Sequence, residues 1–109
     1  METFAEHRLE VLYADGELHS VCIRVGLPRP HPEGDYVCPV QAEGLRLWQG
    51  PKDFCGISSF HALTVGIRFL YEMLSIEVEQ GAVLYWEGTK EPVDLVDLFS
   101  LKKRPGSGS

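Results

Sequence analysis

Residues 58–80, SSFHALTVGIRFLYEMLSIEVEQ, decide the fold of this chain. The spacing of the polar residues, at steps of three and four, predicts one long helix with a single narrow polar stripe. The stripe comprises His61, Thr64, Arg68, Glu72, Ser75 and Glu79. A helix lying on a core needs an apolar face only about 100° wide, whereas this one is apolar around most of its circumference. We therefore expect a sheet to cover one side. The C-terminal segment, a second copy of the chain or a partner protein would cover another.

Sequence signals mark both ends of this helix. Ser58 is a good N-cap, because its hydroxyl can accept an N–H from the first turn. Gly81 stands where a C-terminal glycine commonly ends a helix. Beyond it, residues 82–86 favour a short strand that returns to the sheet. Residues 93–99, VDLVDLF, favour a short helical turn laid against the long helix, with its two aspartates facing water.

Upstream of the helix, alternating apolar and polar residues predict strands at residues 7–14 and 18–25. Asp15-Gly16 between them is the commonest short hairpin signal. Residues 26–34, GLPRPHPEG, are expected to form a loop, because their prolines and glycines interrupt a strand.

Further strands are predicted after this loop. Residues 35–43 favour a third strand, which Pro39 would place at an edge or at a bulge. Residues 45–49 favour a short fourth strand, and residues 50–56 a connection.

The fold class that follows is α+β. We expect an antiparallel sheet of about four strands, in meander order, packed on one long α-helix, with a short C-terminal strand and a helical turn. Residues 1–101 form a single domain in this interpretation. Residues 102–109 are predicted to be a disordered tail, since their Gly/Ser end resembles a flexible linker.

The charge of the chain is acidic and unevenly placed. The net charge is −6, which argues against a general nucleic-acid binder, because such a protein needs a basic face. Between positions 72 and 97 a single base, Lys90, stands among seven acids. The acids are Glu72, Glu77, Glu79, Glu87, Glu91, Asp94 and Asp97. One interpretation is a solvated face that aids solubility. The sharper one is an acidic surface that steers a basic partner protein.

Cysteine usage and hydropathy indicate a cytoplasmic protein. The three cysteines, Cys22, Cys38 and Cys55, are odd in number and widely spaced, which fits a reducing compartment better than a disulfide framework. The N-terminus, METFAEHRLE, has no apolar signal region. No stretch approaches the ~18 uncharged apolar residues of a membrane span.

Motifs that carry chemistry are weak in this sequence. The histidines and cysteines do not have a recognised metal-ligand spacing, so we expect no metal and no cofactor. Cys55 just before the long helix and His61 one turn inside it form a conceivable nucleophile–base pair, but free cysteines more often pack as small hydrophobes. The acid pairs Glu87/Glu91 and Asp94/Asp97 look exposed, which suits charge display more than acid–base catalysis. We therefore predict that the protein is not an enzyme and has no catalytic residues.

Four blocks of the chain resemble a family of small bacterial domains of unknown function. They are Gly26-Leu27-Pro28, Asp35-Tyr36-Val37-Cys38-Pro39-Val40, Gly56-Ile57-Ser58-Ser59-Phe60-His61-Ala62-Leu63 and Leu84-Tyr85-Trp86. The family pattern is similar to Gly-x-Pro, Asp-Trp-x-Cys-Pro-Tyr, Gly-Val-Asp-Ala-x-Gln-Ala-Leu and Leu-x-Trp, in this order. This chain departs from it with Ser58 for Asp, His61 for Gln and an acidic end in place of Gly-Phe-Pro. The resemblance implies a bacterial cytoplasmic protein with no assigned activity.

The leading functional hypothesis is a non-enzymatic protein-binding domain of the kind that neutralises toxins, an immunity protein. Two features suggest this hypothesis: the helix at residues 58–80, which is apolar around most of its circumference, and the acidic segment at residues 72–97. Its protein-binding surface would comprise Trp86, Glu87, Glu91, Asp94 and Asp97, and its partner would be another protein such as a basic toxin. The alternative is a self-associating scaffold, dimeric through the long helix, or a small-ligand-binding domain. Neither hypothesis involves nucleic acid or a membrane.

Overall fold

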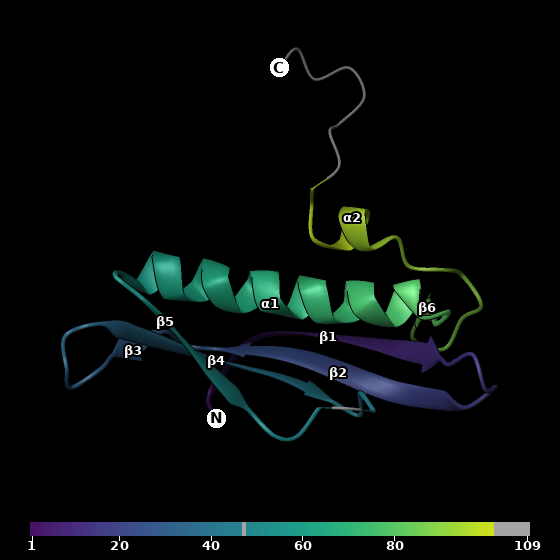
Figure 1. The fold of residues 1–109 in the computed structure, drawn as a ribbon, viewed down its shortest axis with the longest axis horizontal. Helices are drawn as coiled ribbons and strands as arrows, with labels where there is room; N and C mark the ends of the chain where they lie inside the picture. Colours follow the sequence, from purple (N-terminus) through teal and green to yellow (C-terminus); the bar gives the residue numbers. More distant parts are fainter. Residues whose placement is uncertain (47, 102–109) are drawn as a thin grey trace, which may run out of the picture.

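A computed structural model describes residues 1–46 and 48–101. One long helix lies across one face of an antiparallel sheet, which confirms the α+β class (Figure 1). The elements are β1 (Thr3–Leu12), β2 (Leu18–Gly26), β3 (Arg29–Pro30), β4 (Tyr36–Glu43), β5 (Lys52–Gly56), α1 (Ser59–Glu79), β6 (Val83–Trp86) and α2 (Leu95–Leu98). The predicted tail, residues 102–109, lies outside the described residues.

The first hairpin, β1–β2, is confirmed. The N–H of Tyr13 donates to the carbonyl of Glu17 at 2.8 Å and closes a three-residue loop. Gly16 in this loop has a φ of 93°, a left-handed conformation that glycine adopts without steric cost. β1 starts at Thr3, four residues earlier than the alternation predicted.

The third strand, β4, is confirmed, but it is an inner strand. Val40 lies opposite both Val25 of β2 and Lys52 of β5, so β4 is paired along both of its edges. The expected edge position of Pro39 is therefore wrong. Pro39 lies where the pairing of β4 passes from β2 to β3, and a Cβ on Gly26 would come within 2.5 Å of its ring. The missing N–H of proline is tolerated at this break in the ladder.

Three predictions between the hairpin and the helix differ from the structure. In the predicted strand 45–49, whose residue 47 lies outside the described part, Leu45 and Trp48 are both buried and joined by a turn hydrogen bond of 3.0 Å. A spacing of three puts both side chains on the core side, which a strand cannot do. The fourth strand is instead β5, in the predicted connection. The predicted loop 26–34 also contains the two-residue strand β3, which pairs with β4.

The last strand corrects the predicted strand order. β1, β2, β4 and β5 pair in chain order, as a meander would. β6, however, pairs with β1 at the opposite side of the sheet. The chain then doubles back along β6, where the N–H of Val93 donates to the carbonyl of Leu84 at 2.8 Å. The C-terminal segment is thereby carried to the edge of the helix.

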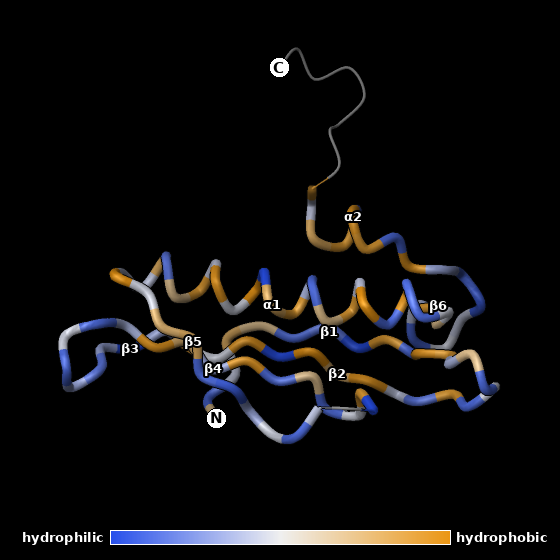
Figure 2. Tube along the Cα trace, viewed as in Figure 1, coloured by the Kyte–Doolittle hydropathy of each residue, from blue (hydrophilic) through white to orange (hydrophobic). Residues whose placement is uncertain are grey.

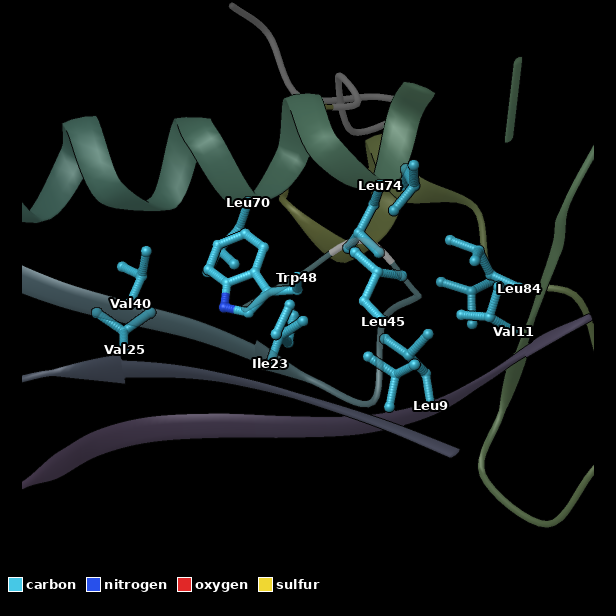
Figure 3. Packing of buried hydrophobic residues seen from close by; sticks show 14 of the residues in the cluster. Leu9, Val11, Ile23, Val25, Val40, Leu45, Trp48, Leu70, Leu74 and Leu84 are labelled. Atoms are coloured by element: carbon cyan, nitrogen blue, oxygen red, sulfur yellow. The ribbon is translucent and has the colours of Figure 1, made fainter. Parts of the chain in front are cut away.

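Both predicted ends of α1 are confirmed. The hydroxyl of Ser58 accepts the N–H of His61 at 3.0 Å, and Gly81 has a φ of 99° beyond the last turn. The sheet-facing stripe of α1 is buried and includes Leu70 and Leu74 (Figure 3). These side chains meet the inward residues of β1, β2 and β4, so the core lies between helix and sheet.

The predicted second cover of α1 is partial. Figure 2 shows the apolar C-terminal segment beside α1, and the ring of Phe99 packs edge-on against Tyr71 at 5.3 Å. Other apolar side chains of α1 remain open to solvent: Phe60, Ile76 and Val78 are exposed. Within the described residues, no helix is long and apolar enough to cross a membrane.

Candidate functional site

Trp86 packs against the rest of the fold and is only partly exposed at the surface. It ends β6, is half-buried, and packs edge-to-face with the ring of His7 at 5.1 Å. The Nε2 atom of His7 is buried and has no hydrogen-bond partner among the described residues. Trp86 therefore serves packing at the sheet edge.

Glu87 and Glu91 lie at the turn that follows β6. The carbonyl of Glu91 accepts the N–H of Trp86 at 3.1 Å, so this turn is hydrogen-bonded to the sheet. Glu87 lines a small cavity of about 170 Å³ together with Arg8 and Arg24. This cavity lies on the sheet face opposite α1.

Asp94 and Asp97 lie together at α2. The Oδ1 atom of Asp94 accepts the N–H of Val96 at 3.0 Å and caps this short helix. Asp97 is exposed within the same turn. The five residues of the predicted binding surface are thus divided. Asp94 and Asp97 accompany the C-terminal segment beside α1, whereas Glu87 faces the outer side of the sheet.

The structure points to a groove between α1 and the C-terminal segment, which we call the α1–α2 groove. It has a volume of about 500 Å³ and a mostly apolar lining. The residues that line it are Thr64, Ile67, Arg68, Tyr71, Glu72, Phe99 and Leu101. Arg68 Nε donates to Glu72 Oε1 at 3.0 Å, so the one base among the described residues of the lining is paired with an acid.

A smaller cavity continues the α1–α2 groove toward the sheet. It holds about 180 Å³ and shares Ile67 and Phe99 with the groove. Leu98 covers it from α2, and Ala5 and His7 of β1 line its floor. The C-terminal segment therefore lies over a continuous apolar depression, and the burial of Val93 and Leu95 anchors that segment.

Sequence reasoning missed the groove itself, although the signals were present. The excess of apolar residues on the helix identified the surface that contains Ile67 and Tyr71. The segment VDLVDLF placed an apolar residue at position 99. What the sequence did not show is that Phe99 packs edge-on against Tyr71 beside an open groove that both residues line.

The structure does not bring Cys55 and His61 together as a nucleophile–base pair. Phe54 of β5 stacks on Phe69 of α1 at 4.6 Å, so strand alternation turns Cys55 to the opposite sheet face. His61 Nδ1 accepts the N–H of Ile57 at 3.1 Å, which makes it part of the helix cap. Cys22 is no better a nucleophile, because burial raises the pKa of its thiol.

The outer sheet face is held by an ionic network. Arg24 donates to both Glu6 and Glu43, and the thiol of Cys22 donates to Glu6 at 3.1 Å. The hydrogen bond from Cys22, followed by that from Arg24, lowers the pKa of Glu6. These groups satisfy one another. In residues 1–46 and 48–101, no three side chains of histidine, cysteine, aspartate or glutamate converge as metal ligands.

Comparison of the chain with models of protein families, with curated proteins and with solved structures gives no match. The resemblance to a small bacterial family therefore stays a prediction.

Proposed function

We propose that this protein is a non-enzymatic protein-binding domain whose α1–α2 groove receives an apolar segment of a partner. The observation that carries the proposal is the open apolar groove beside an uncovered part of α1. A groove with this lining suits an amphipathic segment whose apolar side chains enter it. Glu72 at the groove and Asp97 on α2 favour basic residues flanking that segment.

The finer proposal is a bacterial cytoplasmic immunity protein that neutralises a basic toxin. The acidic balance of the chain supports it, since opposite charge speeds the encounter of two proteins. In this proposal Asp94 and Asp97 beside the groove steer the toxin, and Glu91 at the turn after β6 and Glu87 on the outer sheet face add to the negative field of the molecule. Trp86 packs beneath the turn that carries Glu87 and Glu91.

The test is a selection of binders from a displayed peptide library, using the parent protein and the variant Leu101→Asp. Leu101 is 63% exposed, so the substitution changes the groove with little effect on folding. Leu18→Asp is the matched control, because Leu18 is an exposed leucine of β2 outside the groove. We expect selected peptides to combine apolar and basic residues and to bind the parent and Leu18→Asp alike. Equal binding to Leu101→Asp would place the site elsewhere.

A second proposal, self-association, rests on a separate observation. Ile57 and Phe60, at the start of α1, are 81% and 73% exposed. Large apolar side chains exposed together favour an interface. A two-fold dimer through this end of the helix would cover them. Sedimentation at micromolar concentration would then give twice the chain mass for the parent and the chain mass for Phe60→Glu. A parent that sediments as a monomer would exclude this proposal.

A further inference from the structure

The sheet-facing stripe of α1 ends in a carboxylate. Ala62, Gly66, Leu70 and Leu74 follow one another at steps of four, and Glu77 is the next residue on this buried side. Only 6% of Glu77 is exposed, whereas its neighbours Val78 and Glu79 are open to solvent. Glutamate is rarely buried to this degree unless it is paired.

Glu77 has no such pairing. Its backbone carbonyl accepts the N–H of Ala82 at 3.0 Å, but its side-chain carboxylate forms no hydrogen bond or ion pair with residues 1–46 or 48–101. Its oxygens are not among the buried side-chain atoms that lack a partner, so the carboxylate reaches the pocket beside it. A carboxylate held in this way can accept a donor from a molecule in the pocket.

A pocket at the end of α1 gives access to this carboxylate. It has a volume of about 270 Å³, and Glu77 lines it together with Tyr13, Asp15 and Gln80. The hydroxyl oxygen of Tyr13 accepts the N–H of Arg46 at 2.8 Å and keeps a second lone pair. Burial raises the pKa of Tyr13, so it stays an uncharged hydroxyl.

The charge around this pocket favours a cation. Arg46 also lines it, but its guanidinium lies over the ring of Tyr13 at 3.9 Å and is paired with Asp15 at 2.9 Å and Glu17 at 3.1 Å. Within residues 1–46 and 48–101, the negative charge of Glu77 is therefore left without a paired base. The C-terminal end of the helix dipole adds further negative potential at the same place.

The geometry points to a monovalent organic cation rather than a metal. Among the described residues Glu77 does not converge with two further metal-ligating side chains. An ammonium group has three N–H donors, and the carboxylate of Glu77, the hydroxyl of Tyr13 and the amide oxygen of Gln80 are acceptors around the pocket. Ala14 and Ala82 line the rest and suit a short alkyl chain. We propose that this pocket binds a protonated primary amine, from a small alkylamine or from a lysine side chain, with Glu77 as its counterion.

The experiment is a titration of the full chain with butylammonium chloride, followed by backbone amide chemical shifts. We expect saturable shifts confined to residues around the pocket. Glu77→Gln should weaken binding about tenfold or more, because it removes a charge-assisted hydrogen bond. Glu79→Gln is the matched control, since Glu79 is an exposed carboxylate of the same helix turn. Equal weakening in both variants would mean general attraction to acidic charge and would overturn the proposal.

Two further titrations use only the parent protein, so their results do not depend on how a variant folds. Butanol has a similar shape without the charge, so shifts equal to those from butylammonium would overturn the proposal. Nα-acetyl-lysine methylamide separates the two sources of the amine. If it binds as well as butylammonium, a lysine side chain is the ligand class. If butylammonium alone binds, the ligand is a free alkylamine. If neither binds saturably, there is no amine site.

Discussion

At the scale of single residues, Asp15 links the stability of the first hairpin to pH. Its Oδ1 accepts the N–H of Glu17 at 3.0 Å, and Arg46 adds an ion pair. The bond to Glu17, then that to Arg46, holds the pKa of Asp15 below its ordinary value. A depressed folded-state pKa stabilises the fold above the unfolded-state pKa. That contribution is lost as the pH falls through the folded-state value.

We therefore expect Asp15→Asn to be less stable than the parent above roughly pH 5 and equally stable below roughly pH 2. Urea unfolding across this range measures the difference. Glu33→Gln, a change of an exposed acid in the turn between β3 and β4, should show no comparable trend. A stability difference for Asp15→Asn that does not change with pH would show that the carboxylate charge is not the cause.

Residues also show where sequence reasoning stops. Glu77 belongs to the acidic run of the sequence and was interpreted as one of its surface acids, yet it faces the sheet. The helical period alone would have placed it beside Leu70 and Leu74, but its charge suggested the opposite side. Only the position of Tyr13, just after β1, shows that a pocket lies beside Glu77 at the end of α1.

At the scale of elements, α1 depends on the cap at its start. The hydroxyl of Ser58 accepts the N–H of His61, and the ring of His61 accepts the N–H of Ile57 in return. We expect Ser58→Ala to lower the free energy of unfolding by about 1 kcal/mol, because it leaves one of these donors without a partner. Ser59→Ala, one residue further on, removes no such bond and should change stability by less than about 0.5 kcal/mol. Thermal unfolding of both variants provides the measurement, and equal losses would contradict the capping role.

The elements with strong periodicity were predictable, and those fixed by tertiary contacts were not. The helix, the first hairpin and the strand after the helix have clear spacing and clear end signals. β5 does not, because a short strand with Lys52, Asp53 and a terminal glycine has little alternation to read. Its pairing is fixed by Phe54, whose ring meets Phe69 of α1. The strand with which β6 pairs could not be predicted either, because its pairing with β1 depends on the path of the whole chain.

At the scale of the whole molecule, the order of local opening should follow the packing. β2 is paired on both sides and faces α1, whereas β3 has two residues and α2 a single turn. Backbone hydrogen exchange should therefore be slowest in β2 and the middle of α1 and fastest in β3 and α2. Exchange followed by mass spectrometry of peptides measures this order. Protection of α2 equal to that of β2 would mean that the C-terminal segment is held more firmly than its contacts suggest.

The candidate groove needs this whole-molecule view as well. Its two walls lie about thirty residues apart in sequence, as Ile67 and Phe99 show, and only the return of the chain along β6 brings them together. The spacing of residues in α1 predicted a second cover for the helix, and the charge distribution predicted an acidic surface that binds a partner protein. It did not separate Asp97, beside the groove, from Glu87 on the opposite sheet face.

The turn between β3 and β4 has a practical consequence for engineering. The N–H of His31 donates to the carbonyl of Asp35 at 2.6 Å, so the turn is closed at its base while its residues are exposed. It projects from one end of the molecule, whereas the β1–β2 loop beside the Glu77 pocket lies at the other (Figure 1). A fluorophore or an epitope attached at Glu33 would therefore lie away from the α1–α2 groove and from the Glu77 pocket. This turn is the natural place to attach a label for binding assays.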